Sequence, residues 1–194
     1  NDIANGKDNV SALGTLLAAE RAVYTGGYHI YFTSNHDENS WAGTEFERMG
    51  DGHKTFAALC ATLDGMPLMY SGQEEPLRKR LAFFEKDTIP FKDYAYEGFY
   101  TTLNQLKKKN QALWNGEHGG LSRRINESNE VYAFIREKNG DKFIGVFNLS
   151  GKPQKTTLQV PVTEMNIVFT DDRLTLDTAQ NINLGPWEFF LFSS

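Results

Sequence analysis

Cysteine is nearly absent from this chain, since Cys60 is the single one among 194 residues. One cysteine excludes an intrachain disulfide, so no disulfide framework can hold the fold together. Cys60 lies on the apolar side of a segment with helical spacing, and this position favours a buried, inert thiol over a nucleophile. Stability must come from a packed core, for which 40% hydrophobic and 13% aromatic content is sufficient.

Long hydrophobic runs and strongly basic segments are also missing. No apolar stretch is long enough to cross a bilayer, so no membrane partner is expected. Phosphate binding requires a basic face, whereas the net charge is −5 and the longest basic runs are Arg78-Lys79-Arg80 and Lys107-Lys108-Lys109. Both runs are interpreted as solvated surface, and nucleic acid is excluded as a partner.

An initiator methionine and a signal peptide are absent as well. The chain begins at Asn1, which indicates a fragment of a longer parent protein. The missing leader therefore assigns no compartment, and a secreted or periplasmic parent is compatible with it.

Helical spacing and strand-like runs alternate in the first part of the chain. The predicted helices cover residues 8–24, 51–63 and 96–109, with Asp51 as the N-cap of the second. The predicted strands, apolar on both faces, cover residues 28–34 and 66–71. The order is therefore helix, strand, helix, strand, followed by an irregular stretch over residues 72–96 and the third helix.

Short strands dominate the second part of the chain. They are predicted over residues 121–125, 131–137, 142–149, 155–160, 166–170 and 188–192. The pair Asn139-Gly140 lies between two alternating runs and is the strongest hairpin signal in the sequence. These features predict an antiparallel β domain, a small sandwich, after residue 115.

Polar and titratable side chains follow both predicted strands of the first part. The run from Tyr31 ends in Asn35-His36-Asp37-Glu38, and the run from Gly65 ends in glycine and acid at Gly72-Gln73-Glu74-Glu75. In α/β barrels, groups at the ends of strands point into the pocket that carries the chemistry. Two consecutive strands are therefore expected to deliver polar groups to one rim.

These two runs resemble motifs of the α-amylase family of glycoside hydrolases. The first matches F-x-x-N-H-D through Phe32, Asn35, His36 and Asp37, and the second matches G-x-P-x-x-Y-x-G-x-E through Gly65, Pro67, Tyr70, Gly72 and Glu74. In that family the motifs end the seventh and eighth barrel strands, and Pro186-Trp187-Glu188 is similar to the end of its C-terminal β domain. The resemblance implies a C-terminal remnant of a TIM (β/α)8 barrel over residues 1–115, followed by an antiparallel β-sandwich domain over residues 116–194.

The resemblance also implies roles for individual residues. Asp37 would be the transition-state stabiliser that binds the 2- and 3-hydroxyls of a distorted sugar, with His36, Asn35 and Trp41 as substrate-binding residues. Tyr70 and Glu74 would give structural support. Alternatives stay open: a bare Asn-His-Asp triplet is typical of a solvated turn, and a single loop tryptophan such as Trp41 is as often local packing.

The acids Glu38, Glu45 and Glu75 are interpreted as loop surface. A metal site formed by His36, Asp37 and Glu38 is not expected, because adjacent residues of an extended chain point to opposite faces. No cofactor is expected in this segment. A structural calcium ion occurs in some family members, but its ligands come largely from barrel parts outside this sequence.

The implied activity of the parent is retaining hydrolysis or transglycosylation of α-glucans. This chemistry needs a nucleophile and an acid, which the family carries on its fourth and fifth strands, so the fragment alone is predicted to be inactive. The alternative is a non-enzymatic carbohydrate-binding or ancillary relative with the same fold. Self-association is also predicted, because the barrel remnant would leave a sheet edge and the helix faces of residues 10–24 and 56–63 uncovered, while the part from residue 116 folds independently.

Overall fold

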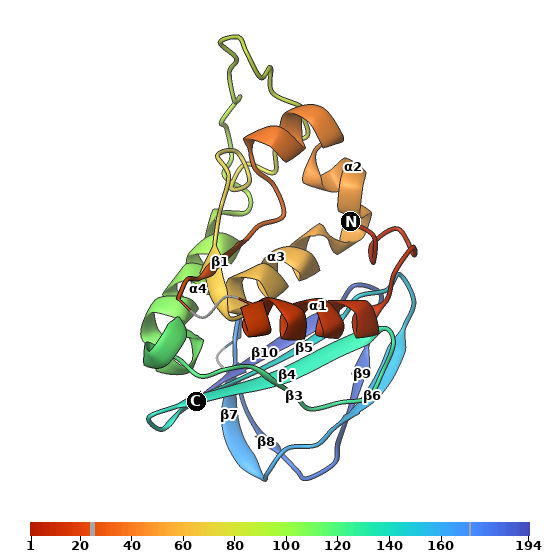
Figure 1. Cartoon of the computed structure of the whole chain (residues 1–194), viewed down its shortest axis with the longest axis vertical. Coiled ribbons are helices and arrows are strands. Elements are labelled where there is room, and N and C mark those ends of the chain that lie inside the picture. The colour runs from red at the N-terminus through yellow and green to blue at the C-terminus, as the bar shows by residue number, and fades with distance from the viewer. Residues whose placement is uncertain (24–25, 171) are drawn as a thin grey trace.

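The computed structural model describes residues 1–23, 26–170 and 172–194. Its first part contains four α-helices and two short parallel strands, drawn in red to green in Figure 1. The helices are α1 (Val10–Val23), α2 (Glu45–Met49), α3 (His53–Thr62) and α4 (Glu97–Lys109). The strands are β1 (His29–Tyr31) and β2 (Gly65–Pro67), and short helical turns cover Glu38–Ala42 (η1), Gly50–Gly52 (η2), Gln111–Leu113 (η3) and Gly116–His118 (η4).

The second part is antiparallel β structure in two sheets. The six-stranded sheet has the order β3-β4-β5-β10-β7-β8, and β6 pairs with β9 in the other. The strands are β3 (Arg123–Arg124), β4 (Val131–Lys138), β5 (Asp141–Asn148), β6 (Gln154–Leu158), β7 (Thr163–Ile167), β8 (Arg173–Leu176), β9 (Gln180–Leu184) and β10 (Phe189–Ser193). The predicted sandwich is confirmed.

The central strands β4 and β5 of the six-stranded sheet are buried on both faces. In β4, Val131, Ala133 and Ile135 pack into a core shared with β6 and β9, because alternate residues of a strand point to one face. Tyr132 and Phe134 point the other way, into a core shared with α1, α3 and α4. Figure 1 shows these helices lying over one face of the sheet. The two parts of the chain therefore share one core.

The β4–β5 hairpin has the predicted turn. Lys138 pairs with Asp141, and Asn139 and Gly140 between them have φ of 50° and 95°. Both values are positive, which is the requirement of a type I′ turn and the reason that asparagine and glycine are favoured there.

The predicted helices are confirmed with small changes at their ends. Residue 24, where the first predicted helix ended, lies outside the described residues. The prediction of Asp51 as an N-cap was wrong: Asp51 lies in η2, and α3 begins after Gly52 without a side-chain cap.

The two strands of the first part are shorter than predicted. The described ladder consists of His29↔Gly65, Ile30↔Met66 and Tyr31↔Pro67, and it ends where the Leu68 N–H donates to the Tyr31 carbonyl at 2.9 Å. After this ladder the chain forms a turn, in which the Tyr70 N–H donates to Gln73 Oε1 and the Gly72 N–H donates to Glu74 Oε2. Residues 69–71 therefore do not extend β2.

The prediction that two helix faces stay uncovered was also wrong. Val10 and Leu17 of α1, and Ala58 and Leu59 of α3, are buried against the aromatic face of the six-stranded sheet. The sheet thus supplies the cover that these helices need. The independent folding expected for the part from residue 116 is untested, and this shared face predicts instead that the part does not fold without the helices.

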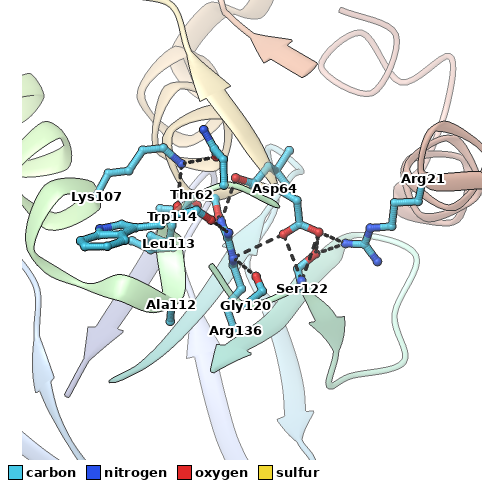
Figure 2. A network of polar contacts seen from close by, with 12 residues as sticks. Arg21, Thr62, Asp64, Lys107, Ala112, Leu113, Trp114, Gly120, Ser122 and Arg136 are labelled. Atoms are coloured by element: carbon cyan, nitrogen blue, oxygen red, sulfur yellow. Dashed lines mark hydrogen bonds and ion pairs between the residues drawn. The ribbon is translucent and has the colours of Figure 1, made fainter. Parts of the chain in front are cut away.

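Arg136 joins the two parts of the chain, as Figure 2 shows. Its side chain is 1% exposed, and its guanidinium donates to the carbonyl oxygens of Thr62 (2.8 Å), Leu63 (2.9 Å), Trp114 (2.7 Å) and Gly120 (2.7 Å). Its Nε lies 3.3 Å from Oδ1 of Asp64, whose carboxylate also pairs with Arg21. Burial lowers the pKa of Arg136 to about 10. One strand residue therefore fixes the end of α3 and the loops that follow α4.

Candidate functional site

Parallel pairing of β1 and β2 places the ends of both strands at one edge. Residues that leave parallel neighbours at their carboxyl ends come close together in space. Here the segment after β1 carries Asn35, His36 and Asp37, and the segment after β2 carries Tyr70 and Glu74. The two motif segments are therefore neighbours, as the sequence predicted.

His36 and Asp37 are both open to solvent at this edge. The side chain of His36 is 67% exposed and that of Asp37 is 60% exposed, with 3.5 Å between His36 Nε2 and Asp37 Oδ2. Asn35 is less exposed, and its Oδ1 accepts a hydrogen bond from the Glu38 backbone N–H at 2.7 Å. Asn35 thus fixes the start of η1, and the acid and the imidazole remain available to a ligand.

Arg48 supports the segment that carries Asn35, His36 and Asp37. Its guanidinium contacts Oε2 of Glu38 at 2.9 Å, the carbonyl of Gly43 at 2.9 Å and the carbonyl of Thr33. Burial lowers the pKa of Arg48, although the neighbouring Glu38 opposes that shift. Glu38 was predicted to be loop surface, and this was wrong because its carboxylate is half-buried in the ion pair with Arg48.

A buried polar cluster lies behind the motif segments. Gln73 Nε2 donates to Glu45 Oε2 at 2.7 Å, to Thr33 Oγ1 at 2.8 Å and to Tyr100 Oη at 3.0 Å, while its Oε1 accepts from the Tyr70 N–H at 2.7 Å. The prediction of Glu45 as loop surface was wrong, since Glu45 is 3% exposed. Desolvation raises the pKa of Tyr100. Gln73 therefore ties the end of β1 to the end of β2 and to α2 and α4.

Glu74 and Glu75 shape the segment after β2 through hydrogen bonds of their carboxylates. Glu74 Oε2 accepts from the Gly72 N–H at 2.9 Å, and Gly72 adopts φ of 98°, which favours glycine. The Glu75 carboxylate accepts from the N–H groups of Lys92 (3.0 Å), Asp93 (3.1 Å) and Tyr94 (2.8 Å). These bonds lower the pKa of Glu75. The Glu75 carboxylate thus closes the base of a loop, whereas the sequence predicted only a surface position for it.

Trp41 lies in η1, directly after the motif. It is 61% exposed, and its ring contacts Phe83 with 5.2 Å between ring centroids. Phe83 in turn stacks on His36 at 5.8 Å. Trp41, His36 and a loop phenylalanine thus share one surface beside Asp37.

Among the described residues there is neither a reactive thiol nor a metal-ligand cluster. Burial raises the pKa of the Cys60 thiol to about 12, which keeps it protonated near neutral pH. Among the described residues, no three His, Cys, Asp or Glu side chains are grouped so that they could hold a metal ion. None of the described helices combines the length and the apolar character needed to span a membrane.

Comparison with known proteins identifies the fold. Neither a family model nor a curated protein matches this chain. A maltogenic α-amylase from Thermotoga neapolitana superposes over 100% of the chain with a TM-score of 0.81 and 22% identity. The chain has the fold of the C-terminal part of an α-amylase. It spans 48% of the length of that enzyme.

Two further α-amylase-family structures show the same relationship. The α-amylase of Geobacillus thermoleovorans, solved with acarbose, matches with a TM-score of 0.72, 15% identity and coverage of 95% of this chain and 43% of its own. The α-amylase of Lactobacillus plantarum matches with a TM-score of 0.74, 16% identity and coverage of 100% and 44%. The predicted fold class, a barrel remnant followed by a β domain, is confirmed.

The residues that support the site were missed in the sequence. Gln73, Glu45 and Arg48 act through contacts between segments far apart in the chain, which leave no local pattern. One local signal was available: Thr44 and Glu47 form a capping box, in which the Thr44 N–H donates to Glu47 Oε2 at 2.7 Å and the Glu47 N–H to Thr44 Oγ1 at 3.2 Å. It marks the start of α2 and hence places Glu45 in a helix.

Proposed function

We propose that this chain is the C-terminal part of a retaining glycoside hydrolase or transglycosylase that acts on α-glucans. Asp37 is the transition-state stabiliser, and His36 and Trp41 contact the sugar. The observation that carries the proposal is the exposed His36–Asp37 pair at the carboxyl end of β1, held on a rigid base by Asn35, Arg48 and Gln73.

The geometry suits this role. A glycosyl transition state is flattened and positively charged, so hydrogen bonds from a carboxylate to the ring hydroxyls strengthen as the ring distorts. Asp37 presents its carboxylate to solvent beside the His36 imidazole, which is a second hydrogen-bonding group for neighbouring hydroxyls. Asn35 contributes by orientation, since its amide oxygen is used by the Glu38 N–H.

The identity of the glucan rests on the structural neighbours. One was solved with acarbose, and another is a cyclomaltodextrin glucanotransferase, which matches over 100% of this chain with a TM-score of 0.73 and 15% identity. Both names point to α-linked glucose polymers as the substrate class. The nucleophile and the general acid belong to the part of such enzymes that this chain does not cover, so we expect no turnover from these 194 residues alone.

The test is Asp37→Asn in the whole protein that contains this chain. We expect kcat on a maltooligosaccharide to fall by about 10²-fold or more, with KM changed only a few-fold, because the lost hydrogen bonds matter most in the transition state. Asp93→Asn is the matched control, since the side chain of Asp93 is 68% exposed, against 60% for Asp37. A near-normal kcat for Asp37→Asn would remove Asp37 from the site.

The same experiment addresses the non-enzymatic alternative. A whole protein that binds the oligosaccharide but never cleaves or transfers it would be a carbohydrate-binding relative. Asp37→Asn would then change affinity alone.

A further inference from the structure

A small polar hollow lies between the segment after β1 and the segment after β2. Its volume is about 10 Å³, which is about the room that one water molecule needs. Its walls include Ser34 and Asn39 after β1, Glu45 of α2, and Ser71 and Gln73 after β2. Ser71 is exposed and the other four are buried by residues of this chain, so further chain could only increase their burial.

Glu45 brings an incompletely paired carboxylate to this hollow. The residue is 3% exposed, and its Oε2 accepts from Thr33 Oγ1 at 3.0 Å and from Gln73 Nε2 at 2.7 Å. Its Oε1 is buried as well and has no hydrogen-bond partner among the described residues. A buried oxygen of a charged group is destabilising when it is left unsatisfied. We therefore expect a partner from outside the chain in the hollow.

The charge of Glu45 is not balanced by a direct ion pair within the described part of the chain. Arg48, one turn further along α2, interacts with this charge, but its guanidinium contacts Glu38 and two backbone carbonyls. Arg78 lies over the ring of Phe46 at 3.9 Å and makes no ion pair with a described residue. Glu38, Glu45 and Arg48 together thus carry one excess negative charge. A cation in the hollow would balance this charge, whereas a water molecule would not.

We propose that the hollow binds one monovalent cation close in size to a water molecule, such as potassium. Glu45 Oε1 is its charged ligand, and the hydroxyl of Ser34 is a neutral one. Ser34 is buried, and its hydroxyl makes no hydrogen bond within the part of the chain that the structure describes. The bound cation would connect α2 to the segment that follows β1.

Divalent cations fit this hollow poorly. Ca²⁺ takes about 6–8 oxygen ligands, and Mg²⁺ keeps several of its waters, whereas the hollow has room for a single guest. Divalent sites also need more charge than one carboxylate provides, and the described residues contain no group of three His, Cys, Asp or Glu side chains suited to a metal ion.

The test is thermal unfolding of the 194-residue chain in the chlorides of potassium, lithium and tetramethylammonium at equal concentration. Tetramethylammonium is too large for the hollow, and lithium gives up its hydration water reluctantly. At about 0.1 M salt we expect the melting temperature to be about 3 °C higher in potassium than in the other two salts, because a ligand that binds only the folded state stabilises it. Equal melting temperatures in the three salts would overturn the cation site.

Glu45→Gln tests where the cation binds. The change removes the charge and keeps the size of the side chain, so we expect the potassium shift to disappear. Glu97→Gln is the matched control, because Glu97 is also the first residue of a helix, α4, but is exposed. This control should keep the full shift, since general effects of salt act on both variants alike. A full shift in Glu45→Gln would show that potassium acts elsewhere and overturn the site.

Ser34→Ala is a second variant that keeps the carboxylate, and it tests the site even where Glu45→Gln does not fold. We expect about half of the potassium shift, because one neutral ligand is lost. An unchanged shift would overturn the role of Ser34 and the placement of the cation in this hollow. The cation site and the proposed function can fail separately, since the kcat of Asp37→Asn in the whole protein tests only the latter.

Discussion

The six-stranded sheet and the two-stranded sheet of β1 and β2 differ in how completely their strands are paired and buried. In the six-stranded sheet, β4 pairs along its whole length with β5 and is buried on both faces. In the pair of β1 and β2, each strand has three residues, and Ile30, Phe32, Met66 and Leu68 are exposed on one face. We therefore assign most of the stability of the chain to the six-stranded sheet, although the candidate site lies at the ends of β1 and β2.

This difference shows how a short strand pair can still position a site. Backbone pairing contributes little there, and side chains provide the rest of the support, because Gln73, Glu45 and Arg48 hold the segments that follow β1 and β2. Buried polar groups of this kind specify one geometry because each lost partner leaves another group unsatisfied.

Removing the first part altogether is the strongest test of this contrast. A chain of residues 116–194 loses the helices that cover Tyr132, Phe134 and Phe147, and it exposes that face of the sheet to water. We expect it to aggregate or to unfold without a cooperative transition, as followed by circular dichroism and light scattering. A monodisperse, cooperatively folding fragment would show that the β domain is independent.

Arg136→Met breaks the connection between the two regions without removing either. Four carbonyl oxygens lose their donor and Asp64 loses a buried partner, so we expect a loss of about 3–5 kcal/mol in the free energy of unfolding. Urea unfolding of the variant gives this value. Arg123→Met, on the exposed neighbouring strand, should stay within about 0.5 kcal/mol of the wild type.

Gln73→Leu weakens only the smaller region. The change leaves the Tyr70 N–H without its partner and removes one donor from Glu45 Oε2 and from Thr33 Oγ1, which keep their bond to each other at 3.0 Å. We expect a loss of about 2 kcal/mol in the free energy of unfolding. Hydrogen exchange at the Tyr70 amide should accelerate more than exchange in β4. Gln105→Leu on the exposed face of α4 is the control. Uniform acceleration throughout the chain would contradict a local role for Gln73.

The exposed face of β1 and β2 predicts weak self-association. Ile30 and Met66 are register partners and are 51% and 39% exposed. We expect concentration-dependent light scattering from the chain, and about tenfold weaker association in the double variant Ile30→Lys, Met66→Lys, which corresponds to about 1.4 kcal/mol. Leu174→Lys on β8 should have no effect. A wild-type chain that stays monomeric would contradict the prediction.

Lys107 gives the smallest effect, at the junction of the two regions. Burial lowers its pKa to about 8, helped by the Arg136 charge and opposed by Asp64, from 10.5 in an unfolded chain. Between these values the unfolded state holds a proton that the folded state has released, so stability rises with pH from about 8 to 10.5. We expect a gain on the order of 1 kcal/mol for the wild type relative to Lys107→Met in urea unfolding. The exposed Lys108→Met should keep the wild-type slope.

Local patterns in the sequence predicted the parts of the fold that local physics determines. The α4 helix and the β4–β5 hairpin follow from helical spacing and from residues that tolerate positive φ, and both are confirmed. The strands β8 (Arg173–Leu176) and β9 (Gln180–Leu184) were missed although polar and apolar residues alternate in both, because each is short and at least half of its residues are polar. Sheet pairing overrides such weak propensity.

The candidate site was likewise predicted only in part from the sequence. Its position at the ends of two parallel strands followed from the motifs at Asn35-His36-Asp37 and Gly72-Gln73-Glu74. The contacts that support the site did not follow from the motifs. Arg48 and Glu45 lie in α2, and they contact Thr33 and Gln73 because α2 packs against the strand ends. The roles of Asp37, His36, Asn35, Trp41, Tyr70 and Glu74 stay predictions.

The clamp formed by Glu75 makes the tip of the loop that follows it, residues 83–86, a replaceable module, because residues 79–82 and 87–88 make the other hydrogen bonds of the loop. The Glu75 carboxylate binds the N–H groups of residues 92–94, so the loop is closed at its base whatever its tip contains. The entropy of closing a loop grows slowly, by about 0.6 kcal/mol for each doubling of length. Longer or different tips can therefore be inserted there while the strand ends and α4 keep their places.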